Sequence, residues 1–319
     1  MIKKIVEVII MLLIIFSSVC ATAGGRYVGK KVLYVDSYHV GYAWSDGIAE
    51  GIRKTLKDTG VELKRIEMDT KRNTSEEFKK AAALNVRAVI AEFNPDVVIA
   101  SDDNASKYLI MPYYKDVDLP FVFCGLNWDA SVYGFPFKNV TGMVEIALVP
   151  QIIKQLRKYA RGDRIGFLGD DTFTSRKNLQ YHRDLLKINY DHVYYAKNFE
   201  EWQAKYIELQ DQVDMLILIN YVGIADWDKE KAQVFVENYT KIPTGTNNTW
   251  TMPFSLLGII KRPEEQGGWA AHAALKILDG TPPGKIPISH NKQGKLYYNL
   301  RIGKKLGITN APAGAIVIE

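Results

Sequence analysis

The segment Lys31-Val-Leu-Tyr-Val-Asp-Ser37 decides the class of fold. It is a short apolar run, rich in β-branched and aromatic residues, that ends in two small polar residues. Such a run predicts a buried strand whose carboxyl end leads into a turn. Ser45 then caps a predicted helix that carries Ile48 and Ile52 on one face and ends at Gly60. The segment therefore predicts the first βα unit of an α/β protein.

The same alternation of strands and helices is repeated in two series along the chain. The predicted strands cover residues 31–35, 61–68, 97–100, 120–124, 164–168, 192–196, 215–219, 242–246 and 296–300. The predicted helices cover residues 45–60, 74–93, 150–159, 175–187, 200–210, 228–238 and 263–280. A capping box, Thr74-x-x-Glu77, opens the second of these helices. Two βαβαβ series in one chain predict the α/β class with two doubly wound parallel-sheet lobes.

The composition is that of an ordinary globular protein. Of the 319 residues, 47% are hydrophobic and 24% are charged, which excludes a disordered chain or a fibre. The basic residues behind the net charge of +5 cluster only in pairs, so we expect no binding to nucleic acid. Two cysteines are too few for a disulfide framework or a Cys-type zinc site.

The sequence motifs of several common enzyme classes are missing. The chain has no G-x-G-x-x-G turn after a strand, no complete phosphate loop, no G-x-S-x-G elbow and no H-E-x-x-H pair. We therefore expect no catalysis, no cofactor and no metal, and we expect His182 and His192 to be surface residues. Two alternatives stay open. Asp102-Asp103 and Asp170-Asp171 could form a metal or acid/base site, and Cys124 could be a nucleophile rather than a small core residue.

The first 23 residues have the features of a targeting segment. Lys3-Lys4 is followed by a short apolar run and by Ala21-Thr-Ala23, a pattern typical of a secretory signal peptide. We expect cleavage after this segment and a periplasmic protein whose one remaining cysteine is Cys124. The alternatives are an N-terminal membrane anchor and a lipoprotein acylated at Cys20, although the residues before Cys20 match a lipoprotein site poorly.

Small polar residues and large aromatic residues follow the predicted strands in both lobes. In open α/β sheets, ligands bind beyond the carboxyl ends of the strands. The candidate ligand-binding residues at these ends are Ser37, Tyr38, Ser101, Asp102, Asp103, Asn127 and Trp128 in the first lobe, and Asp171, Thr172, Asn220, Tyr221, Asn248 and Trp250 in the second. Trp44 is a further candidate, as an aromatic surface on which a ligand could pack. Small polar side chains together with large aromatic ones suit a small polar organic ligand. The alternative is that the polar residues only cap helices and that Trp44, Trp128 and Trp250 are core residues.

Acidic residues predict the charge of that ligand. The carboxylates that follow predicted strands belong to Asp36, Asp102, Asp103, Asp170 and Asp171. The same turns carry no Lys or Arg, so a cationic group on the ligand is expected to offset the cost of gathering these charges. An amino acid is the leading candidate, and a cationic amine or a nucleoside is the alternative.

Motifs along the chain resemble one protein family. They are Leu33-Tyr-Val-Asp-Ser-Tyr-His-Val-Gly-Tyr-Ala-Trp-Ser-Asp-Gly-Ile-Ala-Glu-Gly51, Ser101-Asp-Asp-Asn-Ala105, Phe121-Val-Phe-Cys-Gly-Leu-Asn127, Val140-Thr-Gly-Met-Val-Glu145 and Asn299-Leu-Arg-Ile-Gly-Lys-Lys-Leu-Gly307. In this order they are similar to one branch of the ABC-transporter substrate-binding proteins with the type I periplasmic-binding fold. That branch is related to tryptophan- and tyrosine-binding transport components. The resemblance adds Glu145 to the candidate residues, and Asp102-Asp103 departs from the simple turns of better-known amino-acid binders.

The resemblance implies two lobes with a ligand cleft between them, joined by three crossings of the chain. The crossings are expected near Thr141-Gly142, Pro253 and Pro282-Pro283. They divide the chain into a signal peptide (1–23), a first lobe (24–142 with 254–282) and a second lobe (143–253 with 283–319).

The resemblance also implies a function. The expected protein is a monomeric periplasmic solute-binding protein of an ABC importer. It captures a small amine-bearing ligand by lobe closure and delivers it to an inner-membrane ABC permease. Because the same domain occurs in signalling proteins, the alternative is a periplasmic sensor that presents its ligand to a membrane receptor. An enzyme built on the same fold is the third possibility.

Overall fold

The computed structural model describes residues 25–319, so the predicted signal peptide and the alternative acylation site, Cys20, lie outside the described residues. The chain forms two compact units, one made of residues 25–143 and 266–289 and the other of residues 144–265 and 290–319. Each unit has its own sheet. None of the described helices has the length and hydrophobicity that a membrane span requires.

The crossings between the units correct the predicted domain boundaries. The chain crosses at residues 143/144, 265/266 and 289/290, where the resemblance implied crossings near Thr141-Gly142, Pro253 and Pro282-Pro283. The second crossing comes later because β10 (Leu257–Lys261) pairs with β9 (Thr244–Thr246) and so belongs to the second sheet. The third comes later because Thr141 donates a hydrogen bond of 2.7 Å to the carbonyl of Ile286, which ties that segment to the first unit.

The sheet of the first unit has the strand order β11-β5-β4-β3-β1-β2. The strands are β1 (Lys31–Asp36), β2 (Glu62–Glu67), β3 (Val97–Ser101), β4 (Phe121–Asn127), β5 (Val140–Glu145) and β11 (Ser289–His290). The helices are α2 (Ala43–Leu56), α3 (Glu76–Phe93), α4 (Asp102–Ala105), the π-helix η1 (Ser106–Ile110), α5 (Met111–Tyr113), the 3-10 helices η2 (Ala130–Tyr133) and η4 (Pro283–Lys285), and α10 (Pro263–Leu278).

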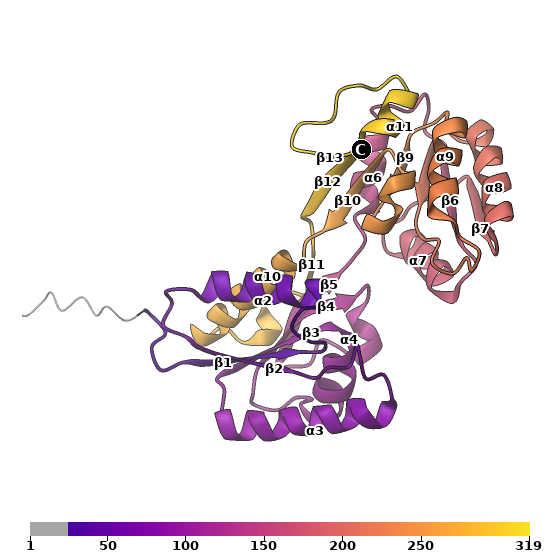
Figure 1. Ribbon diagram of the computed structural model, residues 1–319. Helices are drawn as coiled ribbons and strands as arrows, with labels where there is room; N and C mark the ends of the chain where they lie inside the picture. The colour runs from indigo at the N-terminus through magenta and orange to yellow at the C-terminus, as the bar shows by residue number, and fades with distance from the viewer. Residues whose placement is uncertain (1–24) are drawn as a thin grey trace, which may run out of the picture. The chain divides into compact units, whose positions relative to one another are not determined.

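Helices cover both faces of this sheet. Helices α2 and α10 lie on one face and α3 lies on the other (Figure 1). The buried cluster under α2 and α10 contains Val32 and Val97 from the strands, and Cys124 is a buried core residue in the same cluster. A β-carbon at Gly267 would lie 2.0 Å from the carbonyl oxygen of Ile48, so the contact of α10 with α2 requires a glycine there.

The second unit repeats this architecture with the strand order β13-β12-β10-β9-β8-β6-β7. Its further strands are β6 (Ile165–Asp170), β7 (His192–Ala196), β8 (Met215–Leu218), β12 (Gly294–Asn299) and β13 (Ile316–Ile318). Its helices are α6 (Val149–Leu156), α7 (Phe173–Asp184), α8 (Phe199–Gln212), α9 (Lys229–Tyr239), the 3-10 helix η3 (Thr249–Phe254) and α11 (Leu300–Lys305). Strand β12 runs antiparallel to β10, whereas the pairs from β7 to β10 are parallel.

The two sheets share the strand order of a doubly wound fold. In each, the first strand lies between the second and the third, as β1 lies between β2 and β3 and as β6 lies between β7 and β8. The winding direction therefore reverses beside β1 and beside β6, and these are the points where such sheets bind ligands. The predicted α/β class with two doubly wound, mostly parallel sheets is confirmed.

Some local predictions are wrong. Helix α2 begins at Ala43, and Ser45 lies inside its first turn, where its hydroxyl donates to Asp36 instead of capping the helix. The cap of α3 is Ser75, whose oxygen accepts a hydrogen bond of 3.2 Å from the backbone of Phe78, so a single serine cap replaces the predicted Thr74-x-x-Glu77 capping box. The strands β5, β10, β11 and β13 are absent from the sequence prediction; each lies near a crossing or at the chain end.

His182 is buried, which corrects its predicted place on the surface. Only 1% of the residue is exposed, and its Nδ1 lies 2.9 Å from the hydroxyl of Tyr190. The rings of Phe167 and Tyr190 both contact the imidazole. Burial lowers the pKa of His182 from 6.5 to about 4, because the surrounding rings cannot solvate an imidazolium.

This pKa predicts how the stability of the second unit depends on pH. Between pH 6.5 and 4, the unfolded chain binds a proton at His182 that the folded chain does not bind. The free energy of unfolding is therefore highest above pH 6.5 and falls by about 3 kcal/mol as the pH is lowered to 4. Denaturant unfolding at several pH values measures this slope. His182→Gln should lose that part of the slope, whereas His192→Gln on the edge strand β7 should keep it; equal slopes in wild type and His182→Gln would contradict the assignment.

Candidate functional site

The serines at the ends of β1 and β3 hold the sheet edge together. The Ser37 hydroxyl donates to the carbonyl of Ser101 at 2.5 Å and accepts from the backbone of Ala105 at 2.8 Å. The Ser101 hydroxyl lies 3.2 Å from the hydroxyl of Tyr34, and both serines are fully buried. Their hydroxyls are therefore engaged inside the first unit, and their contact with a ligand stays a prediction.

Asp36 is a buried ion-pair partner. Its carboxylate accepts from Arg65 at 2.5 Å, from the hydroxyl of Ser45 at 2.8 Å and from the backbone of Tyr38 at 2.9 Å. None of the residue is exposed. Arg65 is a residue that sequence reasoning missed, although an arginine in the middle of a predicted strand was the available signal. The turns after the strands carry no base, as the sequence shows, but Arg65 reaches Asp36 from the neighbouring strand β2.

Asp102 fixes the orientation of an indole ring. Its Oδ1 accepts a hydrogen bond of 3.0 Å from Nε1 of Trp44, and only 2% of the residue is exposed. The backbone of Asp102 has a φ of 67°, in the left-handed region that costs a non-glycine residue energy. A β-carbon at Gly125 would lie 3.0 Å from Oδ1 of Asp102, so the next strand also approaches this carboxylate closely.

Asp103 is the more accessible acid of the pair. It is half-buried and accepts from Asn127 at 2.6 Å and from the hydroxyl of Tyr133 at 2.7 Å. Both donors are neutral, and within residues 25–319 no Lys or Arg nitrogen lies within ion-pair distance of Asp103. Half-buried Trp128 follows directly in the chain from Asn127, with a φ of 61°. A carboxylate of this kind suits a cation from outside the chain.

Tyr38 lies beside a lysine that the sequence prediction did not include. Its ring meets the ring of Tyr42 edge-on at 5.3 Å, and the ammonium of Lys71 lies 5.1 Å from the Tyr38 ring centre and 5.0 Å from the Tyr42 ring centre. The backbone of Thr70, the preceding residue, donates to the carbonyl of Ser37 at 3.0 Å and so places Lys71 at the end of β1. The first unit therefore offers one ammonium at the same edge as its acids.

The acids at the end of β6 have hydrogen-bond or ion-pair partners within the second unit. Asp170 is fully buried and accepts from Ser175, from Thr172 at 3.0 Å and from the backbone of Gly223 at 2.7 Å. Asp171 forms an ion pair of 2.6 Å with Arg176. Thr172 also caps α7 through the backbone of Ser175, at 3.2 Å. The contacts of these residues, a helix cap and an ion pair, fit the alternative of helix capping better than they fit ligand binding.

The remaining candidates of the second unit differ in exposure. Asn248 donates to the carbonyl of Ile219 at 2.5 Å. Tyr221 stacks on Trp227 with ring centres 4.3 Å apart, so one face of its ring is covered. Trp250 is 48% exposed, and its indole nitrogen donates to Oδ1 of Asn220 at 3.0 Å. Trp250 is therefore a surface residue, and the alternative that it belongs to the core is wrong.

Glu145 already forms an ion pair within the protein. It ends β5, is 6% exposed and forms an ion pair with Lys261 at the end of β10. This pair joins two strands that lead into crossings of the chain. Within the described range, no group of three or more His, Cys, Asp or Glu side chains is arranged to hold a metal ion.

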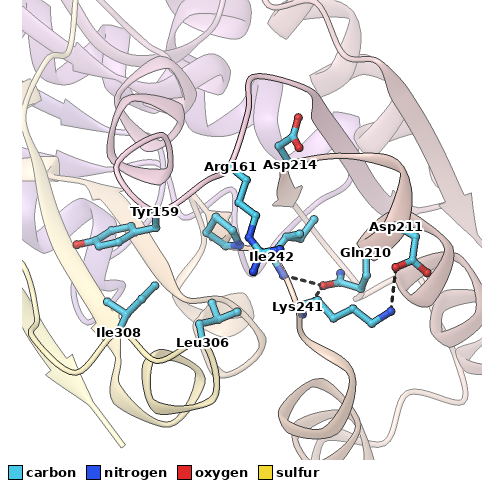
Figure 2. Close-up of a pocket in the computed structure, with 10 residues that line it drawn as sticks. Tyr159, Arg161, Gln210, Asp211, Asp214, Lys241, Ile242, Leu306 and Ile308 are labelled. Carbon is cyan, nitrogen blue, oxygen red and sulfur yellow. Dashed lines mark hydrogen bonds and ion pairs between the residues drawn. The ribbon is translucent and has the colours of Figure 1, made fainter.

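A hollow of about 260 Å³ lies at the opposite edge of the second sheet. Figure 2 shows Tyr159, Leu306 and Ile308 on one side of it and Gln210 and Asp211 on the other. Most lining residues come from the segments that precede β6, β8 and β9, at the amino ends of these strands, and Leu306 and Ile308 follow α11. Because the candidate residues follow the carboxyl ends, this hollow is distinct from the predicted site.

Comparison with known proteins decides the family. A family model described as ABC transporter substrate binding protein matches residues 43–313. The chain belongs to this family of ABC transporter substrate-binding proteins. Members of the family bind small molecules and work with ABC permeases. A comparison with curated protein sequences found no match.

Solved structures share the fold of this substrate-binding protein. A ligand-free substrate binding protein with adhesive properties from Clostridium difficile is 16% identical, with a TM-score of 0.69, over 91% of this chain and 99% of that one. An ABC transporter solute binding protein from Bradyrhizobium with bound Bis-Tris is 13% identical, with a TM-score of 0.55, over 88% and 85%. An ABC domain from Streptococcus pneumoniae in complex with L-Trp is 17% identical, with a TM-score of 0.50, over 91% and 99%. These likenesses confirm the predicted fold.

Proposed function

We propose that this substrate-binding protein captures a small amine-bearing ligand, first of all an amino acid, and delivers it to an inner-membrane ABC permease. The proposal places the exported protein in the periplasm and assigns it no catalysis. Capture is by closure of the two units on the ligand, which brings the strand-end residues of each unit onto it.

The carboxylate of Asp103 is the observation that carries the proposal. It lies at the strand ends, is half-buried and accepts hydrogen bonds from neutral donors, Asn127 and Tyr133. The other acids are less suited, because Asp36 is paired with Arg65 and Asp170 is fully buried. A protonated amine on the ligand would give Asp103 a charged partner and offset the loss of hydration on closure.

Lys71 supports an amino acid rather than a simple amine. Its ammonium is held over the rings of Tyr38 and Tyr42, and it forms no ion pair within the described part of the chain. A ligand with both charges would meet Asp103 with its ammonium and Lys71 with its carboxylate. The indoles of Trp44 and Trp128 supply apolar surface at the same edge for the ligand's side chain.

Mass spectrometry of ligand released from natively purified protein tests the proposal. We expect a small molecule with a primary or secondary amine. The stripped protein should then be stabilised by that compound, by about 2.7 kcal/mol at a hundredfold excess over its Kd. This corresponds to a rise in melting temperature of about 5–10 °C. Release of a phosphate ester or an amine-free dicarboxylate would overturn the amine assignment.

The transport role has its own test. Import of the identified compound by cells should depend on both the gene for this protein and the genes for an ABC permease and ATPase. Unchanged import in the deletion strain, together with loss of a transcriptional response to the compound, would favour the sensor alternative.

A further inference from the structure

We infer that Asn220 is a positioning residue, which locks the indole ring of Trp250 so that an exposed face of the ring meets the ligand. The inference rests on the proposed function. Both residues are predicted from the sequence to bind the ligand. According to this inference, only Trp250 contacts the ligand, and Asn220 acts by orienting Trp250.

Trp250 is an exposed ring with a fixed nitrogen. It lies in η3, just after β9, and is 48% exposed. Its Nε1–H, the only polar group of the side chain, donates to Oδ1 of Asn220 at 3.0 Å. Within residues 25–319, no other aromatic ring is paired with the indole. An apolar ring that is oriented yet uncovered is a surface suited to a ligand.

Asn220 has one orientation that satisfies both of its neighbours. Its Nδ2 donates to Oδ2 of Asp170 at 3.1 Å, while its Oδ1 accepts from Trp250. An indole nitrogen can only donate and an ionised carboxylate can only accept, so the amide cannot be reversed without losing both bonds. The hydrogen bond with Asp170 therefore fixes the amide of Asn220, and the amide in turn fixes the orientation of the indole ring.

Asp170 anchors the chain of hydrogen bonds in the sheet. It ends β6 and is fully buried. The backbone of Gly223 donates to the same Oδ2 at 2.7 Å, and Thr172 donates to Oδ1 at 3.0 Å. The carboxylate is thus held from several sides, and the relay from Asp170 through Asn220 leads from a rigid strand end to the exposed ring. A ring fixed in advance loses less conformational entropy when a ligand packs on it.

A double-mutant cycle with L-tryptophan and L-tyrosine as probes tests the inference. Asn220→Asp keeps the shape of the side chain but removes the donor to Asp170 and places a second carboxylate beside it. We expect this change to weaken binding of the probe on the order of tenfold in the wild-type background. In the Trp250→Ala background, which lacks the ring, the same change should have no further effect on the Kd measured by calorimetry.

Fluorescence gives a readout that does not need a ligand. The signal of Trp250 is obtained by subtracting the spectrum of the matching Trp250→Phe protein. Asn220→Asp should increase the quenching of this signal by acrylamide and lower its anisotropy. The control is Thr251→Val, which removes a buried hydroxyl bonded at 3.2 Å to the carbonyl of Ile219 but leaves the Trp250–Asn220 bond in place. It should leave both the signal and the Kd unchanged.

The outcomes separate this inference from the proposed function. Equal losses from Asn220→Asp in both backgrounds, or an unchanged Trp250 signal, would overturn the positioning role while leaving capture of an amino acid intact. If wild-type protein binds neither probe but binds another amine, the proposed function stands and the cycle is run with that amine, where equal Kd values for wild type and Trp250→Ala would overturn the contact. If it binds no amine at all, both are overturned.

Discussion

Replacing Asp36 with alanine is expected to lower the free energy of unfolding of the first unit by about 3–5 kcal/mol. The change leaves the guanidinium of Arg65, 2.5 Å away and largely buried, without its fully buried partner. It also removes the acceptor for the hydroxyl of Ser45 and for the backbone of Tyr38. Urea denaturation followed by circular dichroism measures the loss, with the transition of the first unit fitted separately.

A second partner of Arg65 provides the matched control. Glu67 lies 3.2 Å from the same guanidinium, and its side chain is 34% exposed. Glu67→Gln should cost less than about 1 kcal/mol, because exposed ion pairs contribute little. If Asp36→Ala fails to fold, Asp36→Asn keeps the shape and still loses the charge. Stability equal to wild type in Asp36→Asn would show that the charge of Asp36 does not hold this strand end.

Asp103→Asn is expected to weaken binding of the amine ligand by about 30-fold to several thousandfold. The substitution removes the negative charge that we propose as the partner of the ligand's ammonium, while the amide oxygen can still accept from Asn127 or Tyr133. Titration calorimetry with the compound identified by mass spectrometry measures the change. A reduced dependence of the Kd on salt should accompany it, since an ion pair is lost.

The control for this variant is Asp129→Asn in the same segment of the chain. Asp129 caps η2 by accepting a hydrogen bond of 2.8 Å from the backbone of Ser131, and asparagine caps helices as well as aspartate does. Its ligand affinity should match wild type. Wild-type affinity in Asp103→Asn would leave Asp103 as a structural residue and would remove the main support for an amine ligand.

Most strands of the two sheets could be predicted because they are short runs, largely apolar, between turn signals. The edge of the sheets that carries the candidate residues followed from the same pattern, since parallel strands of a doubly wound sheet share their carboxyl ends. The crossings could not be placed in this way. Residues 257–261 join the second sheet through pairing with β9 and β12, and the local sequence pattern does not predict such long-range pairing.

The roles of the acids could not be predicted from the sequence for a related reason. Asp36 and Asp103 both follow apolar strands, but only the fold brings Arg65 from the neighbouring strand onto Asp36 and leaves Asp103 with neutral donors. In the sequence alone, an aspartate that caps a helix, one that forms an ion pair and one that is open to a ligand cannot be distinguished. The residues that distinguish them come from other strands or helices, and Arg65 and Lys71 are the clearest cases.

The packing of α10 on the first unit determines when, during synthesis, the core of this unit can be completed. Ala270 and Ala274 of α10 complete the core over Val32 and Ile52, which leave the ribosome more than two hundred residues earlier. The N-terminal segment 25–143 therefore emerges with an exposed apolar face and cannot finish its core until synthesis is nearly over. Contacts so distant in sequence form slowly, so a newly made chain keeps this apolar face uncovered for most of its synthesis.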